Sequence, residues 1–364
     1  MTRGDLLERT IAAIPAPDLD VAAETARLLD AKTKPPGSLG RLEDLACRIA
    51  AIRGSVPRET LRPAIVVAAA DHGVAVRGVS AYPQEVTAQM LASFAGGGAA
   101  IAVLAREAGA RLVVVDAGVI GGASVHGVRS EIVDGARGTE DLTLGPAMRR
   151  STAVGLIERG IALVGELTDD GIGIVGLGEM GIANTTSASA LAAALLPAEP
   201  SSVCGPGTGI DDEGLVRKVE SVSRGLVMLS LGPDPDPIEV LAAVGGFEIA
   251  FLVGVTLGAA ARRVPVMLDG FITSAAALVA ARLCPSVSGS SIAATRSPEP
   301  GHAIVLDALE LEPLLDLRLR LGEGTGAALA FPLVRAAVAI LTDMATFDAA
   351  GVSGPSEAPE PADV

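Results

Sequence analysis

Glu323 is the first candidate for chemistry, because it lies in a glycine-rich stretch, RLGEGTGAALA, that precedes an apolar segment. Gly322, Gly324 and Gly326 leave the backbone free to adopt left-handed or closely packed conformations, so a ligand can reach both the main chain and the carboxylate. Thr325 can cap the helix that is predicted to follow. From this stretch alone, a catalytic acid and an acid that only complements the helix dipole are equally good interpretations.

A second candidate site is GLGEMG, residues 176–181, which matches the dinucleotide-binding pattern GxGxxG between a predicted strand and a predicted helix. A dinucleotide fold also needs an acid at the end of the next strand, but about twenty residues later this chain has the loop LLPAEPSS. We therefore favour a mononucleotide phosphate at the start of the next helix, where Asn184, Thr185 and Thr186 add donors to the free N–H groups. A capped core helix is the alternative.

The stretch GPGTGIDDEGLVRK, residues 205–218, places Thr208 between Gly207 and Gly209 and ends in Arg217 and Lys218. This pattern predicts a cradle for a phosphate or a ribose, although a turn before an amphipathic helix fits as well. The chain has no GxxxxGK[ST] and no acidic pair followed by Thr-Thr-Gly. Neither ATP hydrolysis nor a pyrophosphate donor is therefore favoured.

The histidines share no metal-ligand spacing and are expected to be structural: His72, His126 and His302. The cysteines are odd in number and scattered, which indicates a reducing cytoplasm, and we interpret them as small buried hydrophobic residues: Cys47, Cys204 and Cys284. The N-terminal residues lack the apolar run and the cleavage site of a signal peptide. No metal and no cofactor are expected.

Buried parallel strands are the elements that must position these candidates. Four β-branched and alanine-rich stretches each end in an acid and a glycine: residues 63–73, 111–119, 171–181 and 264–271. Predicted helices separate them, at residues 83–95, 98–108, 146–159, 184–196 and 238–261. This alternation predicts a doubly wound, mainly parallel α/β sheet, whose ligands lie beyond the carboxyl ends of the strands.

The two ends of the chain have different patterns. Helices are predicted at residues 5–14, 17–31 and 41–52, so the chain is expected to be helical up to about residue 60, whereas the Pro- and Ser-rich tail from residue 351 is expected to be disordered. Residues 241–261 are long and apolar enough for a membrane span, but Glu248, Gly245 and Gly246 interrupt them. A buried helix is predicted there instead.

Composition limits the partners of the 364-residue chain. It has 49% apolar and only 2% aromatic residues, so its core must be built from Ala, Val, Leu and Ile, which favours helices layered on a sheet. The net charge of -15 argues against a nucleic-acid partner, because phosphates require a basic face. An anionic small molecule remains possible, since backbone N–H groups and one or two Lys can bind it locally.

Several long motifs resemble the nicotinate-nucleotide–dimethylbenzimidazole phosphoribosyltransferase family: KPPGSLGRLE, ADHGV followed by GVSAYPQEVTAQM, GTEDLTLGPAM, GEMGIANTTSASAL, GTGIDDEGL, GGFEIA, LDGFITSAAAL, SPEPGH, RLGEGTGAALA and MATF. The resemblance implies a Rossmann-like large domain at residues 61–307 and a small helical domain from both chain ends, residues 1–60 with 308–350. It leaves residues 351–364 as a disordered tail. It also implies a homodimer, while the cysteines and the N-terminal residues predict a cytoplasmic protein and the interrupted apolar stretch predicts no membrane partner.

The implied reaction transfers the 5-phosphoribosyl group from nicotinate mononucleotide to 5,6-dimethylbenzimidazole, giving α-ribazole 5′-phosphate and nicotinate for the lower ligand of cobalamin. The implied catalytic residues are Glu323 and Glu179. The residues implied around the acceptor base are Ser80, Tyr82, Gln89 and Leu321. Those implied around the nucleotide, beside Glu179, are Gly181, Asn184, Thr185, Gly207, Thr208, Gly209, Lys218 and Ser297. Two positions depart from the family pattern, Ala183 standing for Gly and Asp141 for Asn.

The chemistry of this reaction needs one base. Nicotinate leaves from a positively charged ring nitrogen and needs no general acid, whereas the azole must lose its N–H proton as its other nitrogen attacks ribose C1′. Carboxylates across the pocket can also stabilise an oxocarbenium-like ribose. The alternatives are a related phosphoribosyltransferase that uses another azole or purine, and a nucleotide-binding regulator with no need of Glu323.

Overall fold

The computed structural model describes residues 3–122, 125–196, 198–229 and 235–353. Its contacts divide the chain into two units, one of residues 1–16 with 62–331 and the other of residues 17–61 with 332–364. This division groups residues 1–16 and 308–331 with the sheet, whereas the sequence analysis expected them in the small domain. Most of the tail, residues 354–364, lies outside the described residues.

The first unit is built on a six-stranded parallel sheet with the strand order β3-β2-β1-β4-β5-β6. The strands are β1 (Pro63–Ala70), β2 (Arg111–Gly118), β3 (Val128–Ser130), β4 (Ile174–Met180), β5 (Val266–Leu268) and β6 (Ser291–Ala293). The order reverses between β1 and β4, which creates a topological switch point at their carboxyl ends. The predicted α/β class and four strands are confirmed. β3 and β6 were not predicted, because each has only three residues and no longer apolar run around it, unlike β5, which lies in the apolar stretch of residues 264–268.

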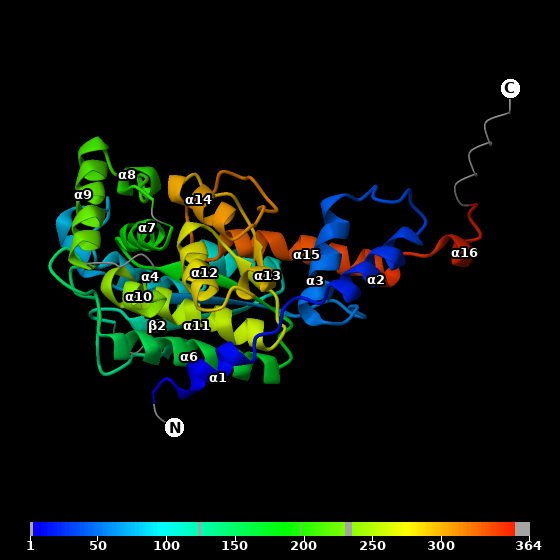
Figure 1. The fold of residues 1–364 in the computed structure, drawn as a ribbon, viewed down its shortest axis with the longest axis horizontal. Helices are drawn as coiled ribbons and strands as arrows, with labels where there is room; N and C mark the ends of the chain where they lie inside the picture. Colours follow the sequence, from blue (N-terminus) through cyan, green and yellow to red (C-terminus); the bar gives the residue numbers. More distant parts are fainter. Residues whose placement is uncertain (1–2, 123–124, 197, 230–234, 354–364) are drawn as a thin grey trace. The chain divides into compact units, whose positions relative to one another are not determined.

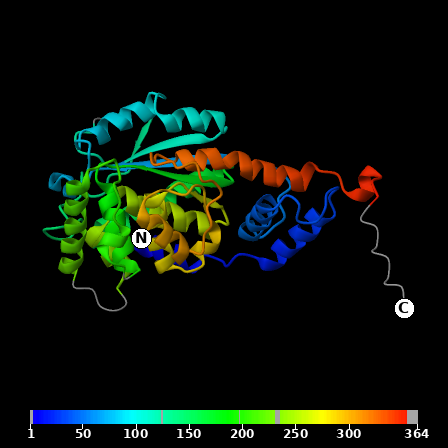
Figure 2. The ribbon, with the colours of Figure 1, turned by 90° about the horizontal axis from the view of Figure 1, so that it is seen from above.

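Helices cover both faces of this sheet. One face packs against α4 (Val86–Ala95) and α5 (Ala100–Glu107), which contact β1 and β2 and lie together in Figure 2. The opposite face packs against α11 (Phe247–Ala261) and α12 (Phe271–Leu283). The other helices of this unit are α1 (Asp5–Ala12), η1 (Gly73–Arg77), α6 (Arg150–Asp169), α7 (Asn184–Leu195), α8 (Pro200–Val203), α9 (Asp212–Leu229), α10 (Pro237–Val244), α13 (Val287–Ser290) and α14 (Pro300–Ala308) (Figure 1).

The helix predicted at residues 238–261 is in fact two helices. α10 ends at Val244 and α11 begins at Phe247, because Gly245 and Gly246 adopt extended backbone angles between them. Every residue of α11 except Ala261 is buried, and α6 and the sheet cover it. The predicted burial of this stretch is confirmed, and the continuous helix was wrong.

Two other stretches of the described residues are long and apolar enough to cross a membrane by length and composition: Val86–Glu107 and Thr325–Asp343. The second is α15, more than half of whose most apolar stretch is buried inside the protein. Core helices commonly have this composition, so the pattern is weak evidence for a span.

The second unit joins the two ends of the chain, as the fold class predicted. It contains α2 (Leu19–Asp30), α3 (Arg41–Arg53), the later part of α15 and α16 (Phe347–Ala350). Residues 31–33 pair with residues 345–347 through the backbone, and Lys32 Nζ donates to the carbonyl of Met344 at 2.7 Å. A buried ion pair, Lys34 with Glu43 at 2.8 Å, holds the loop between α2 and α3. The Lys34 partner lowers the pKa of Glu43 against the opposing effect of burial.

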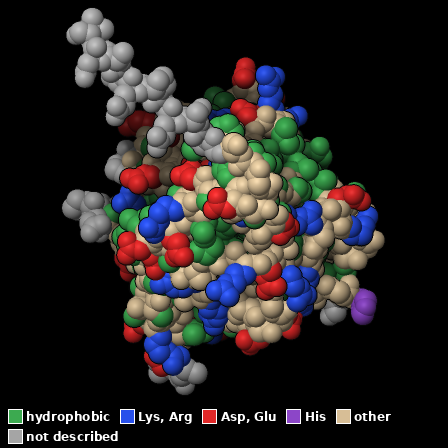
Figure 3. Space-filling view, turned by 90° about the vertical axis from the view of Figure 1, so that its right-hand side faces the viewer, with side chains coloured by type: hydrophobic (Ala, Val, Ile, Leu, Met, Phe, Trp, Pro, Cys, Tyr) green, Lys and Arg blue, Asp and Glu red, His purple; other side chains and the backbone are tan. Residues whose placement is uncertain are grey.

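Charges of both signs are interspersed on the face drawn in Figure 3, where Lys and Arg side chains lie among Asp and Glu side chains.

Candidate active site

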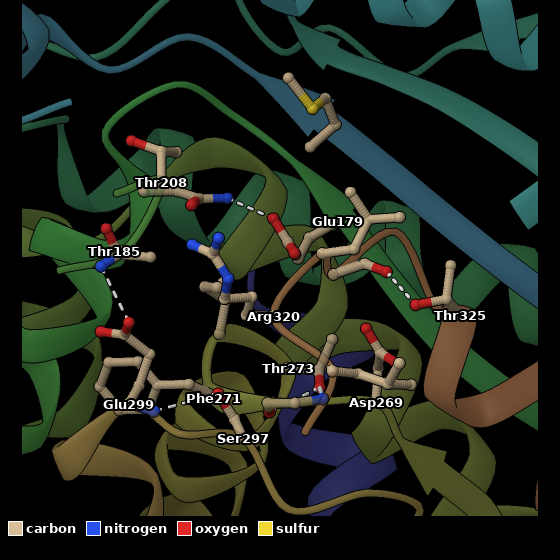
Figure 4. A pocket seen from close by; sticks show the side chains of 18 of the residues that line it. Glu179, Thr185, Thr208, Asp269, Phe271, Thr273, Ser297, Glu299, Arg320 and Thr325 are labelled. Atoms are coloured by element: carbon tan, nitrogen blue, oxygen red, sulfur yellow. Dashed lines mark hydrogen bonds between the residues drawn. The ribbon is translucent and has the colours of Figure 1, made fainter. Parts of the chain in front are cut away.

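A pocket of the first unit lies at the carboxyl edge of the sheet (Figure 4). Five segments line it: the end of β4 with the start of α7, the GPGTG turn, the residues after β5, the residues after β6, and the loop before α15. These five segments are separated in sequence. They meet here because the strands are parallel, so that their carboxyl ends lie on one edge.

Glycines in β4 allow this assembly to pack closely. A Cβ atom on Gly178 would lie 2.4 Å from the carbonyl oxygen of Glu323, and one on Gly176 would lie 3.0 Å from Ala327 and Phe331. The glycines of the GLGEMG stretch therefore let the loop before α15 and the first turns of that helix pack directly against β4. Its match to the dinucleotide pattern reflects this close packing and not a dinucleotide turn.

Glu179 and Asn184 form the floor of the pocket. The amide of Asn184 donates to Glu179 Oε2. Burial raises the pKa of Glu179 to about 8, and the nearby carboxyls of Asp269, Glu248 and Glu323 add to the shift while Asn184 opposes it. This environment favours the neutral form of Glu179 at neutral pH.

The GPGTG turn is held by a buried charged pair behind it. Lys218 in α9 is fully buried, and its Nζ donates to the carbonyl of Gly205 at 2.8 Å and to Thr185 Oγ1 at 3.0 Å. Glu299 accepts the backbone N–H of Gly207 at 2.8 Å. Burial lowers the pKa of Lys218, and the charge of Glu299 opposes this shift. The turn is thus shaped before any ligand binds.

Thr208 connects the turn to the loop that carries two predicted acceptor residues. Its Oγ1 lies 3.2 Å from Ser80 Oγ and accepts the N–H of Ala81 at 3.0 Å. The N–H of Tyr82 donates to Ser80 Oγ at 3.3 Å. The side chains of Tyr82 and Leu321 are each 56% exposed. Two predicted acceptor residues therefore lie beside the predicted nucleotide turn.

Arg320 and Ser297 form another part of the pocket wall. Arg320 is exposed and extends towards the centre of the pocket in Figure 4. The N–H of Ser297 donates to His302 Nδ1 at 2.9 Å, and His302 Nε2 lies 3.0 Å from Ser274 Oγ. Burial lowers the pKa of His302 to about 4, so the ring is neutral and acts structurally, as predicted.

Glu323 lies next to the pocket lining in an unusual backbone conformation. Its φ is +64°, between Gly322 at +82° and Gly324 at +88°, so three successive residues are left-handed. The side chain is 5% exposed, and among the described residues its Oε2 has no hydrogen-bond partner. The N–H of Ile101, in the first turn of α5, donates to the carboxylate, but burial dominates and raises the pKa.

Most predicted site residues are brought together. Those that line the pocket are Glu179, Gly181, Asn184, Thr185, Gly207, Thr208, Ser297 and Leu321. Those that lie next to lining residues are Ser80, Gly209, Lys218 and Glu323, and Tyr82 in turn contacts Ser80. Gln89 is exposed on α4 and is not among the described residues that line the pocket. Their roles towards ligands stay predictions.

Three charged residues of the pocket were not among the predicted site residues: Asp269, Glu299 and Arg320. Each lies in a motif that was quoted, LDGFITSAAAL, SPEPGH and RLGEGTGAALA, so proximity in sequence was an available signal. Asp269 directly follows a strand and is 4% exposed. An acid at the end of a predicted parallel strand was therefore the signal that could have found it.

The two departures from the family pattern have separate structural settings. Asp141 pairs with Arg77 at 2.6 Å and accepts the N–H of Thr143 at 2.9 Å. Ala183 precedes α7 with φ +79°, a left-handed conformation that suits glycine better. The first substitution gains an ion pair, and the second carries backbone strain.

The remaining histidines and the cysteines are peripheral to this pocket. His72 is buried between Glu248, at 2.7 Å, and Ser187, at 3.0 Å, while His126 is exposed. All three cysteines are free, as predicted. The prediction that they are buried holds only for Cys204, since the other two are partly exposed.

Comparisons with known proteins agree on one family. A family model described as phosphoribosyltransferase matches residues 14–352. The nicotinate-nucleotide–dimethylbenzimidazole phosphoribosyltransferase of Chloroflexus aggregans is 52% identical over 355 residues, covering 97% of this chain and 99% of the relative. The enzyme of that name from Geobacter sulfurreducens is 49% identical over 352 residues, covering 96% and 98%. The crystal structure of the Thermus thermophilus enzyme matches with a TM-score of 0.87 at 45% identity. The match covers 93% of this chain and 100% of the Thermus thermophilus chain.

Proposed function

The chain belongs to the nicotinate-nucleotide–dimethylbenzimidazole phosphoribosyltransferase family, and we infer that it transfers the 5-phosphoribosyl group of nicotinate mononucleotide to 5,6-dimethylbenzimidazole. The products are α-ribazole 5′-phosphate, the precursor of the lower ligand of cobalamin, and nicotinate. The protein is thus a glycosyltransferase of the pentosyltransferase type. Its substrates are small molecules.

The donor phosphate is assigned to the GPGTG turn and the start of α7. Free N–H groups at a helix start attract anions, and Thr185 and Thr208 add hydroxyl donors at the pocket surface. Lys218 lies behind Thr185 and contributes its charge, whereas Arg320 reaches the pocket from the opposite loop and can pair with an anionic group of the donor. Gly181, Gly209 and Ser297 shape the same subsite.

Glu323 is assigned as the base that removes the azole proton. The observation that carries this assignment is its buried carboxylate oxygen without a partner among the described residues, on a backbone held in a left-handed conformation. An unpaired buried acceptor is costly unless a ligand uses it. The raised pKa also suits a base that works near neutral pH. The acceptor then lies against Ser80, Tyr82, Gln89 and Leu321.

Glu179 is assigned a role as a hydrogen-bond donor. Its raised pKa favours the neutral acid, so a donor role fits Glu179 better than that of a carboxylate that stabilises the ribose cation. A protonated Glu179 can instead donate to a ribose or phosphate oxygen of the donor. Asn184, whose amide is directed to its Oε2, orients that proton.

We further propose a cytoplasmic homodimer. One supporting observation is that Val76, Tyr82, Ile120 and Leu321 are large exposed apolar side chains of the same unit. The three free cysteines suit a reducing compartment. Light scattering at micromolar concentration should give twice the mass of one chain, and a monomer mass would refute this proposal.

One assay tests the function and separates the alternatives. Nicotinate mononucleotide and dimethylbenzimidazole are incubated with the protein, and nicotinate and the α-riboside are separated by chromatography. A regulator would bind the nucleotide and release no nicotinate. A transferase for another base would release nicotinate faster with a purine or a different azole in place of dimethylbenzimidazole.

A further inference from the structure

Asp269 makes contacts that the proposed reaction does not yet use. It follows β5 directly and is buried at the carboxyl edge of the sheet. Its Oδ1 accepts the backbone N–H of Gly326 at 2.6 Å and of Ala327 at 3.3 Å, and its Oδ2 accepts the N–H of Gly324 at 3.1 Å. Both oxygens are thereby occupied by the turn that contains Glu323 and by the first turn of α15.

The turn needs such an external support. Glu323 is the only residue of the three left-handed neighbours that has a side chain, and L-residues disfavour this conformation. Gly324 and Gly326 permit a close approach to the sheet, since a Cβ on Gly326 would lie 2.7 Å from Asp269 Oδ1. The backbone on the C-terminal side of Glu323 is therefore fixed to β5 by one side chain.

The contacts of Asp269 differ from those of an ordinary aspartate that caps its own helix. Asp18 and Asp236 cap α2 and α10 from the adjoining position, and each accepts one N–H of its own helix, from Val21 and Ile238 respectively. Asp269 reaches across 57 positions to Gly326. In Figure 4 it lies beside Thr325 on the pocket wall, so it links the sheet edge to the reacting side of the pocket.

We propose that Asp269 is a positioning residue, which holds Glu323 where it can take the azole proton. This inference rests on the proposed role of Glu323. Asp269 acts through the backbone of the turn, and its removal lets Glu323 leave the left-handed conformation. A small displacement of a base is enough to lower turnover, because proton transfer requires hydrogen-bond distance.

A double-mutant cycle tests the inference. Asp269→Asn keeps the volume but replaces one acceptor oxygen by an amide that cannot accept an N–H. We expect kcat to fall about 10–100-fold, with KM for nicotinate mononucleotide nearly unchanged. Glu323→Gln alone should be slow, and the double variant should be no slower than Glu323→Gln, because the base that Asp269 positions is already gone.

Two further variants keep the test decisive. Asp236→Asn alters an aspartate cap in the same unit and should leave kcat unchanged. If Asp269→Asn does not fold, Gly326→Ala serves as the second variant. Its Cβ would lie 2.7 Å from Asp269 Oδ1 and 2.7 Å from Thr295 Cγ2, so it crowds the same carboxylate and should show the same non-additivity with Glu323→Gln.

The outcomes are distinct. A double variant slower than Glu323→Gln by the full Asp269→Asn factor would overturn the inference and leave the proposed function standing, as would a wild-type kcat for Asp269→Asn. A wild-type kcat for Glu323→Gln would instead overturn the base assignment on which the inference depends.

Discussion

The two glycine turns of the pocket differ in how their acidic side chains are held. Behind the GPGTG turn, Glu299 Oε1 accepts the N–H of Gly207, and Lys218 bonds to Thr185 and to the carbonyl of Gly205. In the turn before α15, Glu323 is itself part of the left-handed backbone. Each acid keeps its Oε2 without a partner among the described residues, but only Glu323 presents that oxygen from a strained backbone.

We therefore expect the GPGTG turn to determine binding of the donor and the turn before α15 to determine the rate of the reaction. A preformed turn lowers the cost of fixing a flexible phosphate, because its side chains are already ordered. A base must instead keep an acceptor oxygen free, which destabilises the empty protein. Changes in the first turn should therefore alter affinity, and changes in the second should alter turnover.

The largest expected effect comes from Glu323→Gln. Glutamine keeps the size of the side chain but cannot accept the azole proton, so kcat should fall about 10²–10⁴-fold while both substrates bind nearly as before. If Glu323 only interacted favourably with the dipole of α15, the variant would keep the wild-type kcat, and its free energy of unfolding would fall by about 0.3–1 kcal/mol. Measuring kcat and the melting temperature of this variant decides between the two roles.

Lys218→Met is expected to have the next largest effect. It keeps most of the buried volume but removes the charge behind Thr185, so binding of nicotinate mononucleotide should weaken by about 1.5–3 kcal/mol. Binding of the uncharged benzimidazole should change little. The neighbouring Arg217, which contacts the carbonyl of Gly78, gives the control Arg217→Ala. Equal losses for both ligands in calorimetric titration would contradict a phosphate role for Lys218.

Glu179, at the floor between the two turns, predicts a pH dependence of stability. Its folded pKa, about 8, is raised above the ordinary value, 4.5, so the folded state binds the proton more tightly than the unfolded state. Its contribution is complete below the unfolded pKa and is lost as the pH rises through about 8.

Between pH 6 and 9, the wild type should therefore lose about 1–3 kcal/mol more of unfolding free energy than Glu179→Gln does. Denaturant unfolding at both pH values measures the difference. Asp269 and Lys218 also titrate, but they are present in both proteins. Subtracting the pH-dependent loss of Glu179→Gln from that of the wild type therefore leaves the contribution of Glu179. Parallel pH profiles would show that Glu179 is not held protonated.

The smallest expected effect belongs to Ala183→Gly, at the start of α7. Relief of the left-handed conformation is worth about 1–2 kcal/mol, and loss of a buried methyl group costs about 0.8 kcal/mol. The variant should thus gain about 0–1 kcal/mol of stability without a change in kcat. A clear loss of stability would mean that the methyl group packs better than its backbone conformation suggests.

The sequence predicted the features that depend on local pattern. Apolar runs ending in an acid and a glycine located β1, β2, β4 and β5, and the alternation with helices determined the parallel sheet. The glycines around Glu323 and in GPGTG marked turns where a ligand can approach. Long motifs added the family, which the comparisons confirm.

Other features were decided only by tertiary structure. The break at Gly245 and Gly246, the three-residue strand β6 and the bonds from Asp269 to the turn of Glu323 depend on partners far away in sequence. Burial raises the pKa of Glu179 and of Glu323, and a sequence does not state which side chains will surround a carboxyl group. Local sequence thus determined which residues could do chemistry, whereas long-range packing decided their protonation and which oxygens were left free, because desolvation and hydrogen bonding act through space.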